Sequence, residues 1–292
     1  MIPAAFEYLR AHSIDEAFTH LQQHGGEARV LAGGQSLIPA MRFRLARPAV
    51  LIDINEVKEL NYLRSGGGML AIGAIARDSD IERAPWIGER RWSLLHDASR
   101  VVADPVVRQM GTVVGSLCHN DPAGDWTAVA LATRAEVVVR GKSGERTVAM
   151  DDFLVDSFAT RVGDGELALE VRFPVPDERT AGSYQKVERK VGDFATAAAA
   201  VQVSLNADGT IRAAAVALSA AGPCAIRVEE AERLLAGQKP SREIIRAAAD
   251  ATSRRSSPQA DLRGSIEYKK NLAGVLVARG LGQAFERLGV RV

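Results

Sequence analysis

A short segment rich in proline and glycine divides this chain and constrains its fold more than any other feature. The segment covers residues 174–182 and contains Pro174, Pro176 and Gly182 between two strand-like runs. Because proline fixes φ and has no backbone N–H, such a segment ends a strand and favours a linker. A chain of 292 residues is also long for one core. We therefore expect one domain over residues 1–177 and a second over residues 178–292.

The second domain is predicted to be an α+β unit. Its strand-like runs come first and its helical patterns follow, which is typical of an antiparallel sheet with helices on one face. Three strands are expected, with a hairpin turn at residues 206–209 between the last two, and serine N-caps begin two of the helices. The strands are predicted at residues 183–190, 195–205 and 211–219, and the helices at residues 227–236, from Ser241 and from Ser265.

In the first domain, strands alternate with helices. The clearest element is a helix over residues 13–24, because Ser13 and Glu16 form a capping box and Gly25 can end the helix. The other predicted elements are strands at residues 29–32, 50–54, 70–75 and 167–173, a helix at residues 92–102, and a hairpin over residues 136–149.

Composition excludes several classes of protein. With 37 Lys and Arg against 36 Asp and Glu, the chain has no net field for nucleic acid or an acidic membrane. Cys118 and Cys224 are its only cysteines, too few for a four-thiolate zinc site or an iron–sulfur cluster. No apolar run suits a signal peptide or a membrane span, so we expect a cytoplasmic protein.

Three segments carry residues suited to chemistry. The first glycine segment, residues 32–37, follows a strand, and its glycines would let backbone N–H groups form an anion-binding nest. It matches neither GxGxxG nor a phosphate loop, and an ordinary tight turn is the alternative.

The second glycine segment, residues 111–116, is predicted to be a glycine turn and leads into a polar run over residues 119–125. Backbone donors there would suit a phosphate, and the carboxylates of Asp121 and Asp125 would suit sugar hydroxyls. The alternatives are a turn at Asp121 and a helix N-cap at Asp125. His119 has no second histidine at metal spacing and is better explained as a structural residue.

The third segment, residues 184–195, is a strand-like run with a charged end. Alternation places Lys186, Glu188 and Lys190 on one face. The alternative to a functional role is a solvated face with weak surface ion pairs.

Together these segments resemble the FAD-binding medium subunits of the molybdenum hydroxylases, such as carbon monoxide dehydrogenase and heterocycle dehydrogenases. The family's Ala-Gly-Gly-His/Gln-Ser loop matches residues 32–36, and its Thr-Ile-Gly-Gly loop matches residues 112–115. Residues 186–195 are close to a Lys-x-x-x-Arg-x-Gly-Asp-Phe-Ala pattern, and an Asp-Leu-Arg-Gly-Ser pattern starts at Asp261. Four ordered matches are far more specific than one. Val114 departs from the pattern, because many members have glycine there.

The resemblance implies a PCMH-type FAD-binding domain of two subdomains, residues 1–55 and 56–177, followed by the α+β domain. FAD would lie between the subdomains, with both glycine segments on its pyrophosphate. Asp125 would bind a sugar or ribityl hydroxyl, and Lys186 would favour a reduced, anionic flavin. The cofactor-binding residues implied are Leu31, Ala32, Gly33, Gly34, Gln35, Ser36, Leu37, Val102, Ala103, Gly111, Thr112, Val114, Gly115, Ser116, Asp121, Gly124, Asp125, Leu167, Ala168, Lys186 and Phe194.

The resemblance also implies a role in a larger enzyme. A large subunit would hold the molybdenum–pterin cofactor, a small subunit would hold two [2Fe–2S] clusters, and this chain would pass electrons through FAD to an external acceptor. The assembly would be a dimer of heterotrimers. No side chain of this chain is expected to act as a catalytic acid or base, and no metal is expected in it. Two alternatives remain open: a self-contained FAD-dependent oxidase of small alcohols, and a scaffold subunit without flavin.

Overall fold

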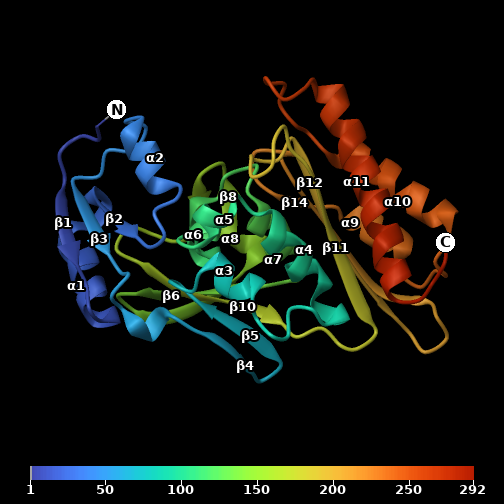
Figure 1. The fold of residues 1–292 in the computed structure, drawn as a ribbon, viewed down its shortest axis with the longest axis horizontal. Helices are drawn as coiled ribbons and strands as arrows, with labels where there is room; N and C mark the ends of the chain where they lie inside the picture. The colour runs from blue at the N-terminus through green and yellow to red at the C-terminus, as the bar shows by residue number, and fades with distance from the viewer. Residues whose placement is uncertain (1) are drawn as a thin grey trace.

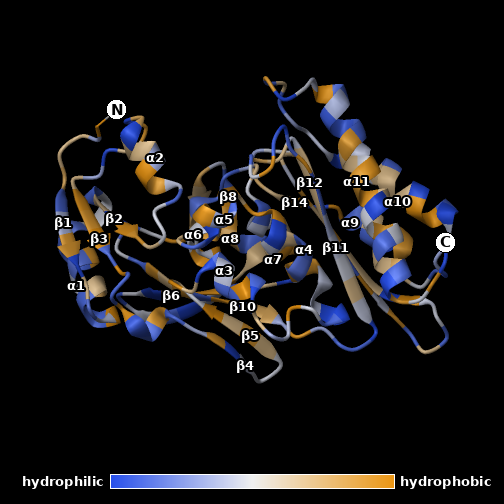
Figure 2. Ribbon diagram, in the orientation of Figure 1, coloured by the Kyte–Doolittle hydropathy of each residue, from blue (hydrophilic) through white to orange (hydrophobic). Residues whose placement is uncertain are grey.

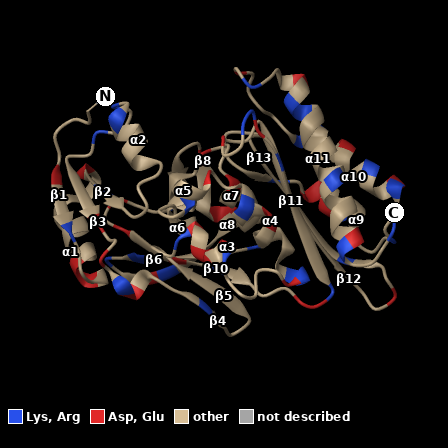
Figure 3. Ribbon diagram, in the orientation of Figure 1, with Lys and Arg blue, Asp and Glu red and all other residues tan. Residues whose placement is uncertain are grey.

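Three sheets follow one another along the long axis of the molecule (Figure 1). The computed structural model describes residues 2–292. Helices pack against the sheets throughout, and the predicted α+β class is confirmed. Acidic and basic residues alternate along the ribbon without a large region of one sign (Figure 3).

The first sheet is parallel and has the order β1-β3-β2. Its strands are β1 (Glu7–Arg10), β2 (Ala28–Leu31) and β3 (Val50–Asp53). Ser13 is the N-cap of α1 (Ile14–His24), as predicted: Ser13 Oγ accepts a hydrogen bond from Glu16 N at 3.1 Å. The predicted capping box is incomplete, because Glu16 Oε2 accepts from His12 N, at 2.7 Å, and not from the N-cap N–H. β1 was not predicted, because its side chains are mostly exposed at the sheet edge and its sequence carries no apolar alternation.

The second sheet is antiparallel, with the order β4-β5-β10-β6-β7. Its buried strands and the helices on them contribute most of the larger core, which also takes in residues of the first sheet and of the inner face of the third. Hydrophobic residues recur along these elements in Figure 2. The strands are β4 (Leu63–Gly66), β5 (Met69–Gly73), β6 (Glu136–Gly141), β7 (Gly144–Ala149) and β10 (Leu167–Pro174). A small hairpin of β8 (Leu154–Asp156) and β9 (Ala159–Thr160) stands beside it.

Short helices connect the strands of the first and second sheets. They are α2 (Leu37–Arg42), α3 (Asp78–Glu82), α4 (Ser93–Val101), α5 (Pro105–Arg108), α6 (Val113–His119), α7 (Asp125–Ala132) and α8 (Met150–Phe153), with 3₁₀ turns at Gly25–Glu27, Lys58–Leu60 and Arg90–Trp92. Two details of the sequence analysis need correction. The second glycine segment is the start of helix α6 rather than a turn, because Thr112 serves as its N-cap. The N-cap of α7 is Gly124, and Asp125 is the first helical residue.

The third sheet is antiparallel and lies between two layers of helices. Helices α10 (Arg242–Arg255) and α11 (Ile266–Arg287) stand on its outer side, whereas α4 and α7 pack against its inner face (Figure 1). Ser241 and Ser265 are N-caps, as predicted. The remaining elements are β11 (Thr180–Val187), β12 (Ala197–Leu205), β13 (Ile211–Ser219), β14 (Ile226–Arg227) and α9 (Glu229–Leu235).

The third sheet has one strand more than the sequence predicted. The additional strand is β14, which pairs with β13 through only two residues and is too short to carry a periodic pattern. The proline-rich segment between β10 and β11 joins the second and third sheets. Among residues 2–292, no helix is both long enough and apolar enough to cross a bilayer.

Candidate functional site

The two glycine segments meet at the boundary between the first and second sheets. Gly33, just after β2, lies against Met110 and Gly111, just before α6. A Cβ atom built on Gly33 would lie 2.0 Å from the carbonyl oxygen of Met110 and 3.0 Å from Gly111 Cα. The close backbone approach therefore requires glycine at position 33.

The first glycine segment presents a row of backbone donors without protein partners. Within residues 2–292, no acceptor is found for the backbone N–H groups of Gly33, Gly34, Gln35, Ser36 and Leu37. Gly34 has φ +72, the left-handed conformation that lets successive N–H groups converge. Unpaired N–H groups beside a close glycine contact suit an anion such as a pyrophosphate, so the residues present fit the group that the resemblance implies.

The second glycine segment is held by its own helix cap. Thr112 Oγ1 accepts a hydrogen bond from Gly115 N at 3.1 Å, and Thr112 O accepts one from Ser116 N at 3.0 Å. A Cβ atom on Gly115 would lie only 2.6 Å from Thr112 Oγ1. The side chain of Val114, the residue that departs from the family pattern, is 2% exposed and belongs to the core. The core thus accommodates its bulk.

Two polar side chains that the sequence analysis did not single out connect the glycine segments. Asn55 Nδ2 donates to the carbonyl oxygen of Ala32 at 2.8 Å, and Arg77 Nη1 donates to that of Met110 at 2.8 Å. Arg77 Nη2 also donates to Asn55 Oδ1 at 2.6 Å. Asn55 directly follows the predicted strand of residues 50–54, and the carboxyl ends of parallel strands meet at one edge of a sheet, so its proximity to Ala32 could have been inferred.

A buried carboxyl lies behind the second glycine segment. Asp78 is 3% exposed, its backbone N–H donates to Gly111 O at 2.9 Å, and its Oδ1 accepts a hydrogen bond from Trp126 Nε1 at 3.0 Å. A Cβ on Gly111 would lie 2.4 Å from Asp78 Oδ2. Burial raises the pKa of Asp78 to about 7, although the bond from Trp126 opposes the shift.

This pKa predicts a dependence of stability on pH. Because the folded carboxyl holds its proton up to about pH 7 and the unfolded one only to 3.8, stability should fall as pH rises from about 4 to 7. Asp78→Asn should lessen that fall, by about 1.4 kcal/mol per pH unit at most. Urea unfolding at pH 5 and pH 7 measures the difference. Asp250→Asn, at an exposed site, is the control, and equal pH dependence in Asp78→Asn and the unmodified chain would contradict the prediction.

Asp125 and Lys186 contact each other across the interface between α7 and β11. Lys186 Nζ lies 3.0 Å from Asp125 Oδ2 and 3.2 Å from Glu188 Oε2, and it donates to Val101 O at 3.1 Å. Tyr184, which the sequence analysis did not select, donates to Asp125 Oδ1 at 2.7 Å. Burial raises the pKa of Asp125, and Lys186 and Tyr184 counteract this by favouring the carboxylate.

The polar run before α7 is fixed by local contacts. Asp121 Oδ1 accepts a hydrogen bond from Ala123 N at 2.9 Å, which agrees with a turn at Asp121. Gly124 O accepts a hydrogen bond from Ser219 Oγ of the third sheet at 2.6 Å. His119 packs against Phe158, with ring centroids 5.2 Å apart, and burial lowers its pKa, which favours the neutral ring.

The other predicted site residues lie in two places. Val102 and Ala103 follow α4, and Ala103 faces the loop after β11: a Cβ on Gly192 would lie 3.2 Å from the Ala103 carbonyl carbon. Phe194 stands on that same loop and is 46% exposed. Leu167 and Ala168 are buried at the start of β10, the strand on which α6 packs.

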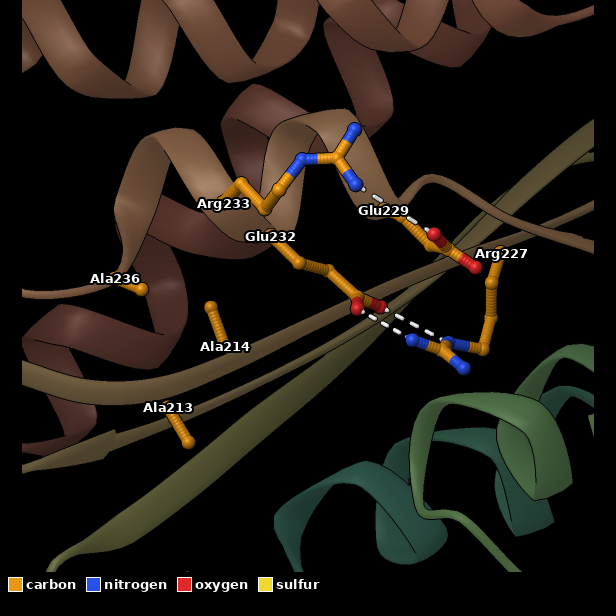
Figure 4. Close-up of a pocket in the computed structure, with 7 residues that line it drawn as sticks. All are labelled: Ala213, Ala214, Arg227, Glu229, Glu232, Arg233 and Ala236. Carbon is orange, nitrogen blue, oxygen red and sulfur yellow. Dashed lines mark hydrogen bonds and ion pairs between the residues drawn. The ribbon is translucent and has the colours of Figure 1, made fainter.

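A separate cavity of about 290 Å³ lies between α9 and the third sheet (Figure 4). Its charged side chains already pair with one another: Arg227 Nη2 lies 2.6 Å from Glu232 Oε2, and Arg233 Nη1 lies 3.6 Å from Glu229 Oε2. Arg227 also bridges to Asp151 of α8 at 2.7 Å. This cluster therefore joins the second and third sheets, and the glycine segments are the better candidate for a ligand site.

Comparisons with known proteins agree with this geometry. The family model described as FAD binding domain in molybdopterin dehydrogenase matches residues 4–176, and the one described as CO dehydrogenase flavoprotein C-terminal domain matches residues 182–284. Carbon monoxide dehydrogenase medium chain from Hydrogenophaga pseudoflava is 39% identical over 287 residues, covering 98% of this chain and 99% of the relative. The 6-hydroxypseudooxynicotine dehydrogenase complex subunit alpha from Paenarthrobacter nicotinovorans is 34% identical, with coverage of 98% and 97%.

A solved structure extends the agreement to three dimensions. Carbon monoxide dehydrogenase from Hydrogenophaga pseudoflava, in a form that lacks the Mo-pyranopterin moiety, has a chain that superposes with a TM-score of 0.95 and 39% identity, covering 98% of this chain and 99% of that chain. Sequence and fold therefore agree with these relatives over nearly the whole length of the chain. The chain belongs to the family of FAD-binding medium subunits of molybdenum hydroxylases.

Proposed function

We propose that this chain binds FAD between its two glycine segments and serves as the electron-transferring flavoprotein of a molybdenum hydroxylase. The observation that carries the proposal is the row of unpaired N–H groups of residues 33–37 beside the close contact of Gly33 with Met110. When bound, FAD supplies the redox chemistry, and the chain's own residues hold and orient it.

The residue roles follow the implied site. Backbone groups of Ala32, Gly33, Gly34, Gln35, Ser36 and Leu37 would hold the pyrophosphate on one side. On the other side, the N–H groups of Gly111, Gly115 and Ser116 already bond within the chain, which within residues 2–292 leaves those of Thr112 and Val114 as the free donors among the predicted residues. The hydrogen bonds of Asp125 to Tyr184 and Lys186 support a second role for Asp125, which is to keep the Lys186 ammonium in place. Lys186 would then contribute positive charge from the third sheet. We also propose that the chain forms two domains, residues 1–177 and residues 178–292.

Two partner subunits complete the proposed enzyme. The relatives are named as a medium chain and as a subunit of a dehydrogenase complex, which supports an assembly with a large molybdenum-cofactor subunit and a small iron–sulfur subunit. The two cysteines of this chain cannot hold the clusters, so the clusters must lie on a partner. We infer a dimer of heterotrimers in the cytoplasm. The substrate would bind the large subunit, and relatives named for carbon monoxide, nicotine and glyceraldehyde show how widely it varies in the family.

Absorption spectra of the purified chain test this proposal. The full chain is expected to be yellow with flavin bands and inert toward substrates by itself. Co-expression with the genes next to its own should add iron–sulfur absorption, molybdenum and substrate-dependent bleaching of the flavin. Turnover of a small alcohol by the single chain would instead indicate a self-contained oxidase. A chain that stays colourless after incubation with FAD would indicate a scaffold and contradict the proposal.

A further inference from the structure

We propose that Arg77 and Asn55 act as a pair of positioning residues that hold the two glycine segments at the separation FAD requires. The inference rests on the proposed FAD site and deepens it, because it names residues that control the affinity of that site without forming part of either segment. Asn55 bonds to Ala32 of the first segment, Arg77 bonds to Met110, the residue directly before the second segment, and the two side chains bond to each other.

Arg77 bonds to the backbone directly before the second segment. It is half-buried at the N-cap position of α3, and its guanidinium donates from Nη1 to Met110 O at 2.8 Å and from Nη2 to Asn55 Oδ1 at 2.6 Å. A guanidinium has its donors in a rigid planar fork, so its two acceptors, Met110 O and Asn55 Oδ1, are held at a fixed distance from one another. Lysine has no such fork.

Asn55 secures the first segment, and its orientation is determined by its partners. Its Nδ2 donates to Ala32 O at 2.8 Å and to Asp53 Oδ1 at 2.6 Å, which leaves Oδ1 to accept from Arg77. Asp53 also accepts a hydrogen bond from Asn55 N at 2.8 Å and one from the hydroxyl of Tyr8. An amide with every group assigned cannot flip without losing bonds.

The hydrogen bond from Asn55 to Ala32 O also fixes the direction of the next backbone N–H, that of Gly33. In a trans peptide the C=O and the following N–H point in opposite directions. Because Asn55 fixes Ala32 O, it directs the N–H of Gly33 away from itself, and that N–H is the first of the unpaired row. Arg77 holds Met110 O, the atom that a Cβ on Gly33 would meet first. The pair therefore controls both the distance between the segments and the direction in which the unpaired N–H groups point.

The first and second sheets are also joined by contacts that do not involve this pair. Gln22 Nε2 donates to Gly165 O at 2.7 Å, and Arg140 pairs with Asp15 at 2.5 Å. Loss of the Arg77–Asn55 contact should therefore loosen the glycine segments without separating the sheets. We expect a greater effect on FAD affinity than on the stability of the apo chain.

A double-mutant cycle in the full chain tests the pair. Asn55→Ala, Arg77→Met and the combined variant are titrated with FAD after removal of bound flavin, and the melting temperature of each apo form is measured in parallel. Each single change should weaken FAD binding by roughly tenfold or more. The combined variant should bind FAD almost as well as the single variant with the lower affinity, because both substitutions remove the same connection. Arg77→Lys should fall between, because an ammonium can keep one of the two bonds.

Arg64→Met is the matched control, because Arg64 is an exposed arginine of β4 that lies over the Tyr62 ring. Its FAD affinity should equal that of the unmodified chain. Single variants within twofold of the unmodified affinity, or effects that add fully in the combined variant, would overturn the inference. So would a loss of affinity matched by a collapse of the apo melting temperature. An unmodified chain that fails to bind FAD would instead overturn the proposed function itself.

Discussion

Gly33→Val is expected to abolish retention of FAD while the chain remains folded. The Cβ atom alone would lie 2.0 Å from the carbonyl oxygen of Met110, and backbone on both sides leaves no flexible group that could yield. The two glycine segments must therefore separate, which displaces the unpaired N–H groups from the pyrophosphate. We expect affinity for FAD to fall by at least about 100-fold, equivalent to about 2.8 kcal/mol.

The measurement is the ratio of flavin to protein absorbance after gel filtration, with far-ultraviolet circular dichroism and a melting temperature to establish folding. Gly66→Val is the matched control, because a Cβ at Gly66 of β4 meets nothing within 4 Å and valine favours a strand. The control should retain FAD at the level of the unmodified chain. Stoichiometric FAD in folded Gly33→Val would show that the ligand site lies elsewhere.

Lys186→Met is expected to lower the free energy of unfolding by about 3–5 kcal/mol, the usual cost of removing one partner of a buried ion pair. The side chains of Lys186 and Asp125 are 3% and 7% exposed, and both Asp125 and Glu188 lie within 3.2 Å of the Lys186 nitrogen. Methionine fills the space and leaves two carboxylates facing each other. Unfolding in urea at pH 8 measures the loss.

The loss should depend on pH. Burial already raises the pKa of Asp125, and removal of the ammonium takes away the largest effect that lowers it, so this pKa should rise further. A raised carboxyl pKa contributes stability at low pH that is lost as pH rises through it, so Lys186→Met should be more stable at pH 5 than at pH 8.

A second substitution provides the control for that result. Adding Asp125→Asn to Lys186→Met should restore much of the stability at pH 8, because only one carboxylate then remains. Lys190→Met, at an exposed lysine just beyond β11, should change stability by no more than about 0.5 kcal/mol. If Lys186→Met were as stable as the unmodified chain at pH 8, the ion pair would have no part in holding α7 against β11.

Local features of the fold were predictable from the sequence. The N-caps Ser13, Ser241 and Ser265, the hairpin of β6 and β7, and the strand β13 each depend on residues close together in the chain. The prediction failed where local signals were weak or misleading. Strands β1 and β14 are an exposed edge and a two-residue pair, and the glycines of residues 111–116 obscured the start of helix α6.

The chain's own sequence determined the two glycine segments, the shortage of cysteine and the order of motifs, and it was the resemblance of these ordered motifs to a known family that indicated a flavin subunit of a larger enzyme. The tertiary structure alone decided what those residues contact. It brought Gly33 against Met110, joined Ala32 to Met110 through Asn55 and Arg77, and paired Asp125 with Lys186. The reason is physical: caps and turns form among neighbouring residues, whereas these contacts join segments far apart in the chain and exist only once the sheets have packed together.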